Sequence, residues 1–280
     1  MLSQPASTDL RPDMTTAELK QAIKSLDLFL QDNIFQSAIN DTLNKRSHFF
    51  DALLCQLWQT LELDNRFISL NAVGGYGRQT LHPFSDIDIC IIHDGELTAS
   101  DGTKISEFLT QLWDIGLDLG HAVRSLKDTY QACKDDVTIA TSLLEIRHLF
   151  GHTEHQQQVL SALYGQDLWQ SQAFFNAKQS EQQERHAKAQ GTAFSIEPNL
   201  KTSPGGIRDI QTLTWVARKH FGVANMQSLR RFGFLTNDEY AELMECQNFL
   251  FRVRFALPPI EALRYPLIGR TCLRRVLQWC

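Results

Sequence analysis

The chain has 280 residues, of which 43% are hydrophobic, and a formal net charge of -5 at pH 7. A chain of this size and apolar content can bury one good core, with or without a helical subdomain beside it. The acidic balance argues against non-specific nucleic-acid binding, which needs a basic surface. No apolar run of about 20 residues could span a membrane, so we expect neither a nucleic-acid nor a membrane partner.

The cysteines and the first residues favour a reduced, cytoplasmic setting. The six cysteines show no C-x-x-C spacing. Residues 1–12 are polar and lack the apolar segment of a secretion signal. Disulfides are rare in such a compartment, so we expect free thiols.

Residues 1–59 are predicted to form an N-terminal helical region. Thr15 and Glu18 have the spacing of a capping box, in which each residue bonds the backbone N–H of the other. Apolar residues then recur at helical spacing over 19–30 and again over 34–58. This pattern indicates amphipathic helices that pack on the following segment.

The most informative pattern lies in residues 60–128, the predicted catalytic core. Residues 67–73 (FISLNAV) predict a strand that runs into Gly74-Gly75, and residues 87–92 (IDICII) predict a second strand. Asp86 and Asp88 are spaced i and i+2 at the start of the second strand, so their side chains share one face. A helix over 105–113 and a third strand over 117–125 follow.

This arrangement suggests phosphate chemistry. Two carboxylates roughly 5 Å apart repel by about 3 kcal/mol at an effective dielectric near 20, and a divalent cation removes that repulsion. Glycines one strand away let a phosphate approach backbone N–H groups closely. Phosphoryl or nucleotidyl transfer uses both elements.

Residues 129–257 are predicted to be mainly helical. The pattern predicts one helix over 139–149 ended by Gly151, further helix over 156–190, a long functional loop over 191–206, and helices over 210–221 and 239–257. Gly222 and the pair Pro258-Pro259 are expected to end the last two helices.

Two motifs carry a family resemblance. The run 74–90, GGYGRQTLHPFSDIDIC, resembles the nucleotidyltransferase signature in the form found in bifunctional PII uridylyltransferase/uridylyl-removing enzymes. The run 196–211, IEPNLKTSPGGIRDIQ, resembles the second characteristic motif of that family, and the likeness extends over about residues 15–257. The resemblance implies an α/β (α+β) fold with a small nucleotidyltransferase sheet flanked by N- and C-terminal helical regions. It also implies Mg²⁺-dependent transfer of UMP from UTP to a tyrosine of the PII nitrogen regulatory protein.

The resemblance implies a metal site as well. Asp86 and Asp88 would hold two Mg²⁺ ions, or Mn²⁺ in their place, because these ions prefer oxygen ligands. Such folds need a third carboxylate on an adjacent strand, and Leu117-Asp118-Leu119 supplies Asp118. Asp114 is the competitor, although its pattern places it on the preceding helix.

Other residues are candidates for nucleotide contacts, and each has a plain structural alternative. The candidates are Gly74, Gly75, Arg78, Ser85, Lys201 and Arg208. The glycine pair could be an ordinary turn, Ser85 a cap and Arg78 a solvated side chain. In the second motif, the other glycine pair could simply turn the chain, and Asp209 could favour a helix N-terminus through the helix dipole.

Two other readings of the motifs remain open. An adenylyltransferase that modifies glutamine synthetase has the same glycine pair, Asp-x-Asp element and later Gly-Gly-x-Arg-Asp-Ile. The chain could also be an inactive nucleotide-binding remnant, because the HD and ACT domains expected of the resembled family have no counterpart in the sequence. The Arg-rich tail over 258–280 is off-pattern, as a frameshift or early stop would produce.

The histidines do not predict a second metal site. His148, His152 and His155 have helical ligand spacing, but Gly151 interrupts the helix and no cysteine or paired carboxylate completes the set. His93-Asp94 is an isolated dipeptide at a strand end and does not indicate the HD hydrolase domain.

Overall fold

The computed structural model describes residues 9–165, 168–189, 199–222 and 226–257. The chain divides into two compact units, residues 1–161 and 162–280. The predicted tail over 258–280 and residues 191–198 of the predicted loop lie outside the described residues.

The first unit begins with two packed helices, α1 (Thr16–Asp32) and α2 (Ile39–Gln59). Thr15 and Glu18 form the predicted capping box at the start of α1. Arg46 of α2 donates to the Asp27 carboxylate of α1 over 2.7 Å. This ion pair joins the two helices beside their apolar contact faces.

A four-stranded mixed sheet forms the centre of the first unit. The strands are β1 (Ile68–Ala72), β2 (Ile87–His93), β3 (Leu119–Ser125) and β4 (Arg147–Gly151), in the order β3-β2-β1-β4. β2 and β3 are parallel, whereas β1 is antiparallel to both of its neighbours. The first three strands were predicted from the sequence and are confirmed, as is the α/β class.

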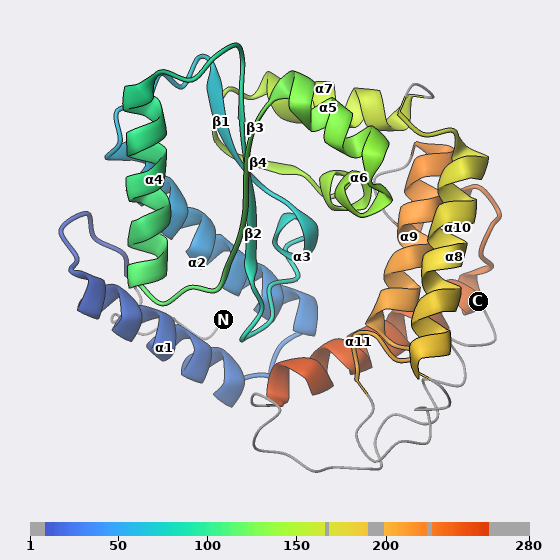
Figure 1. The fold of residues 1–280 in the computed structure, drawn as a ribbon. Helices are drawn as coiled ribbons and strands as arrows, with labels where there is room; N and C mark the ends of the chain where they lie inside the picture. Colours follow the sequence, from blue (N-terminus) through green and yellow to red (C-terminus); the bar gives the residue numbers. More distant parts are fainter. Residues whose placement is uncertain (1–8, 166–167, 190–198, 223–225, 258–280) are drawn as a thin grey trace. The chain divides into compact units, whose positions relative to one another are not determined.

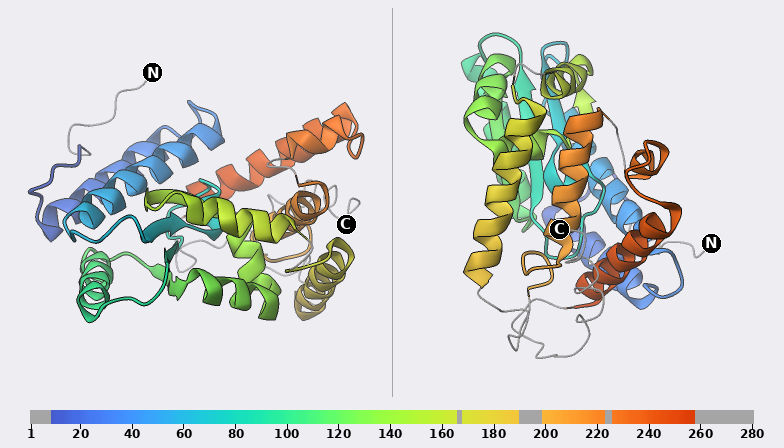
Figure 2. Two further views of the ribbon diagram at one scale, coloured as in Figure 1. Left: turned by 90° about the horizontal axis from the view of Figure 1, so that it is seen from above. Right: turned by 90° about the vertical axis from the view of Figure 1, so that its right-hand side faces the viewer.

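Helices cover both faces of this sheet, as Figures 1 and 2 show. One face carries α1, α2 and α4 (Ala99–Asp114), where Trp58 of α2 meets Phe108 of α4 edge to face. The other face carries α5 (Leu126–Asp135), α6 (Val137–Leu143) and the start of α7 (Glu154–Tyr164). Strands β1 and β2 are therefore buried almost throughout.

The predicted helix over 139–149 is wrong in its second half. The helix α6 ends at Leu143, and Arg147–Gly151 forms β4 along the free edge of β1. An edge strand with unpaired N–H and C=O groups gains a ladder of hydrogen bonds from such a partner, and this long-range gain outweighs the local helical pattern. The sheet consequently extends beyond residue 128, where we expected the core to end.

The second unit is helical in the part that the structure describes. It contains α8 (Ser171–Ala189), α9 (Ile207–Phe221), α10 (Gln227–Arg231) and α11 (Asn237–Ala256). Gly222 ends α9 in the left-handed conformation with φ 63°, as predicted. No helix in these described segments, or in those of the first unit, is long and apolar enough to cross a membrane.

Candidate active site

The glycine pair forms a tight turn at the end of β1. Gly74–Gly77 make a single helical turn, α3, directly after the strand. Gly74 has φ 57°, a conformation that favours glycine. The amide of Val73 donates to the carbonyl of Asp88 over 3.0 Å, so the turn is bonded to β2 at the aspartate motif.

The Asp88 carboxylate lies between two glycine backbones. A Cβ on Gly74 would stand 2.9 Å from Asp88 Oδ2, and a Cβ on Gly120 would stand 2.2 Å from Oδ1. Gly120 is the direct partner of Asp88 in the parallel β2–β3 pair. Both positions must therefore be glycine for this carboxylate to keep its place. The sequence analysis had identified Gly74 but not Gly120.

Asp86 and Asp118 precede neighbouring parallel strands. Ile87 pairs with Leu119, and the Ile87 amide donates to the Asp118 carbonyl over 2.8 Å. Continuing this register places Asp118 beside Asp86 at the same end of the sheet, and both residues are exposed. Asp118 stands just before β3 rather than inside it, whereas Asp114 is the last residue of α4.

A small pocket adjoins Asp88 on the face covered by α6. It has a volume of about 170 Å³, and Gly120, Arg124, Ile139 and Ser142 are among its lining residues. Polar and apolar groups therefore line the space next to the carboxylate.

A partly buried hydrogen-bond network holds the glycine turn. Arg147 of β4 donates to both carboxylate oxygens of Asp51, over 2.8 and 2.9 Å. The Tyr76 hydroxyl donates to the same carboxylate over 2.7 Å, and the Arg147 side chain also donates to the carbonyls of Tyr76 and Gly77. Burial, together with the Asp51 charge, raises the pKa of Tyr76 well above its usual value, so the hydroxyl stays a donor. Apart from the place of Tyr76 inside the motif, no sequence pattern indicated this network.

Arg78 and Ser85 flank this site. Arg78 Nη1 lies 3.9 Å from Oε1 of Glu145, a buried carboxylate. Ser85 is half-buried in the turn before Asp86, where its amide donates to the His82 carbonyl over 3.2 Å.

The second motif belongs to the second unit, and Asp209 is its centre. This side chain is fully buried and accepts hydrogen bonds from the Gly205 amide, over 2.6 Å, and from Arg185, over 2.7 Å. Burial alone would raise the pKa of Asp209, but the hydrogen bonds from Arg185 and the Gly205 amide outweigh it, and the pKa is lowered. Asp209 therefore fixes the Pro-Gly-Gly turn to α8, a larger role than the helix-dipole contact that we expected.

The two predicted cations of this motif lie near that turn. The Arg208 guanidinium stands 5.2 Å from the centre of the Trp215 ring. The Lys201 amide donates to Asn199 Oδ1 over 2.9 Å. Lys201 and Arg208 thus flank a turn that Asp209 holds rigid.

The donor atoms in the first unit suit a hard divalent cation. Asp86, Asp88 and Asp118 offer only carboxylate oxygens, which Mg²⁺ and Mn²⁺ prefer. The two missing Cβ atoms leave the space that Asp88 needs, and the glycine turn leaves backbone accessible beside it. A sheet with a glycine turn and clustered aspartates at one end defines the chain as a nucleotidyltransferase.

Comparisons with known proteins agree with this class. Residues 54–137 match the family model described as "Nucleotidyltransferase domain", and residues 173–262 match "GlnD PII-uridylyltransferase". Over these two stretches the chain is similar to proteins named bifunctional uridylyltransferase/uridylyl-removing enzyme.

The relatives are similar along almost the whole chain. The chain is 44% identical to such an enzyme of Vibrio cholerae over 264 residues, which are 94% of this chain and 30% of the relative. It is 43% identical to one of Aliivibrio fischeri, covering 94% of this chain and 30% of the relative. For one of Vibrio parahaemolyticus the identity is 45%, over 89% of this chain and 28% of the relative. The chain thus spans less than a third of the length of these relatives.

Proposed function

We propose that this chain transfers UMP from UTP to a tyrosine hydroxyl of the PII protein and releases pyrophosphate, in the cytoplasm. The observation that carries the proposal is the Asp88 carboxylate held between Gly74 and Gly120. The names of its relatives support the choice of UMP, and the name of the second matching family supports PII as the substrate.

The aspartates would have separate roles. Asp86 and Asp88 would hold two Mg²⁺ ions, for which Mn²⁺ could substitute, and Asp118 would complete the second site. Bound Mg²⁺ would neutralise charge on the triphosphate and lower the pKa of the attacking hydroxyl. Asp118 would accept the tyrosine proton as the phenolic oxygen bonds to the α-phosphorus and the bond from that phosphorus to the bridging oxygen of pyrophosphate breaks.

The remaining candidates would position the nucleotide. The amides of Gly74 and Gly75 would donate to triphosphate oxygens, with Ser85 adding a hydroxyl donor. Arg78 would contact a phosphate by leaving Glu145, and Lys201 and Arg208 would supply positive charge on the nucleotide side. Catalysis would then depend mainly on orientation and preorganised charge.

The test is UMP incorporation into purified PII from labelled UTP, with ATP in a parallel reaction. Asp86→Asn and Asp88→Asn keep shape but remove charge, so each should lower turnover more than tenfold, a change of about 1.4 kcal/mol. Asp118→Asn should do the same, whereas Asp114→Asn is the matched control and should leave turnover unchanged.

Four results would contradict the proposal. Transfer of AMP in preference to UMP would favour the adenylyltransferase reading of the motifs. Wild-type turnover in Asp88→Asn would show that Asp88 is not a ligand of the catalytic metal. A loss in Asp114→Asn but not in Asp118→Asn would move the third carboxylate to α4. No incorporation by the wild-type chain would support the inactive-remnant reading.

A further inference from the structure

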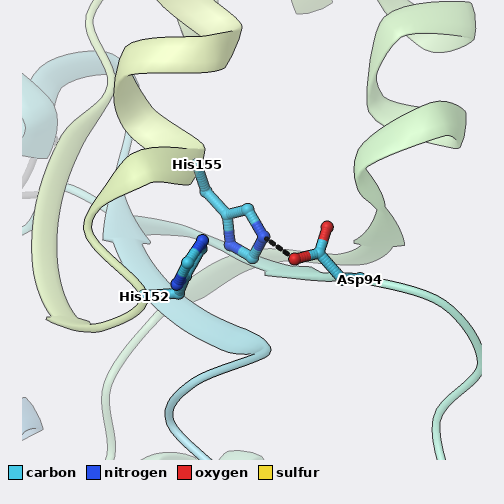
Figure 3. A group of neighbouring side chains, drawn as sticks. All are labelled: Asp94, His152 and His155. Carbon is cyan, nitrogen blue, oxygen red and sulfur yellow. Dashed lines mark ion pairs between the residues drawn. The ribbon is translucent and has the colours of Figure 1, made fainter.

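A second group of metal-ligating side chains lies at the opposite end of β2 from Asp86 and Asp88. Asp94 directly follows β2, His152 directly follows β4, and His155 lies in the first turn of α7. One ligand atom from each lies within 4.8 Å of the others, and Figure 3 shows the three side chains converging. Asp94 is six positions after Asp88, about 20 Å of extended strand, so this group is distinct from the candidate active site.

Phe67, just before β1, and the first two residues of β1, Ile68 and Ser69, bond to these three residues. The Asp94 amide donates to the Phe67 carbonyl over 2.9 Å, and the His152 amide donates to the Ile68 carbonyl over 3.0 Å. Ser69 Oγ lies 2.8 Å from His155 Nδ1. The backbone that carries the group is therefore fixed by the sheet rather than by a free loop.

The buried His155 presents one ring nitrogen to the group. The ring is fully buried, and its Nε2 makes no hydrogen bond within the described residues; Asp94 Oδ2 lies 3.2 Å away, outside hydrogen-bond geometry. The other nitrogen, Nδ1, faces Ser69 Oγ, which itself accepts from Asn71 Nδ2 over 2.9 Å. Metal-bound histidines are held in this way, with the second ring nitrogen on an outer hydrogen-bond partner.

The other two members of the group lie close to this ring. Asp94 Oδ2 lies 3.2 Å from His155 Nε2, the pair that Figure 3 joins by a dashed line. The centre of the His152 ring lies 4.6 Å from that of His155.

We propose that Asp94, His152 and His155 form a site for Zn²⁺ or a similar divalent transition metal. Two imidazoles and one carboxylate are ligands that zinc takes and magnesium does not prefer. Tetrahedral zinc with bonds near 2.0–2.1 Å places ligand atoms roughly 3.4 Å apart. Asp94 and His152, whose side chains are 43% and 25% exposed, would close by about 1 Å around the fixed His155 and leave the fourth position to water.

The experiment is a Zn²⁺ titration of the metal-stripped full chain, followed by a chelator-competition measurement and by the visible spectrum of the Co²⁺-substituted protein. We expect one high-affinity ion per chain with nitrogen and oxygen ligands, undisturbed by excess Mg²⁺. His152→Gln and Asp94→Asn should each weaken binding at least tenfold, and Ser69→Ala about 10–100-fold through the orientation of His155.

His148→Gln is the matched control, because His148 Nε2 lies 3.1 Å from the Gly151 carbonyl and outside the group. Circular dichroism without metal checks that each variant folds. His155 is buried, so His155→Gln could fail to fold, and the test therefore uses the two partly exposed ligands, Asp94 and His152. Zinc affinity equal to wild type in both His152→Gln and Asp94→Asn, thiolate bands in the Co²⁺ spectrum, or no binding would overturn the proposal.

Discussion

Replacing Gly120 by alanine tests whether the place of the Asp88 carboxylate determines activity. The new Cβ would stand 2.2 Å from Asp88 Oδ1, closer than packed atoms allow. The Asp88 carboxylate would therefore have to move from its place between the two glycines. A displacement of about 1 Å at a reacting centre can cost about 100-fold in rate, so we expect a loss of that order in UMP incorporation.

Stability should change little in the same variant. Alanine in a strand is favoured over glycine by about 0.5–1 kcal/mol, which offsets part of the local strain. Gly102→Ala in α4 is the matched control, since a Cβ there meets no atom within 4 Å. We would measure turnover and the thermal midpoint of both variants. Wild-type turnover in Gly120→Ala, or a fall in midpoint large enough to explain the lost activity by unfolding, would refute the reasoning.

Three further predictions concern the supporting networks. Arg147→Met removes the charged partner of Asp51 and should lower the free energy of unfolding by about 2–3 kcal/mol. This is less than for a fully buried pair, because both side chains are partly exposed. An unchanged urea midpoint would contradict this. Tyr76→Phe removes one hydrogen bond and should lower the free energy of unfolding by about 1 kcal/mol, measured by urea denaturation. A loss as large as that of Arg147→Met would show that the hydroxyl does more than support the turn. Asp209 has a lowered pKa in the folded chain, so its stabilisation is present above its unfolded pKa of about 3.9 and is lost as pH falls through the folded value. Asp209→Asn should therefore be less stable than wild type at pH 7 and differ least at low pH, and urea melts that show a constant difference would contradict the assignment.

Much of the fold could be predicted because its signals are local. The capping box at Thr15, the left-handed end of α9 at Gly222 and the strands β1 and β2 each depend on neighbouring residues. The common face of Asp86 and Asp88 follows from strand geometry alone.

The sequence by itself determined the class of chemistry, because the glycine pair and the two aspartates are close in the chain and their spacing has a direct geometric meaning. Only the tertiary structure decided that residues 147–151 form a strand, that Gly120 stands against Asp88, and that Asp94 meets His152 and His155. The physical reason is the same in each case. These contacts join residues far apart in the sequence, and they depend on the pairing of strands in the sheet, which no local pattern of side chains encodes.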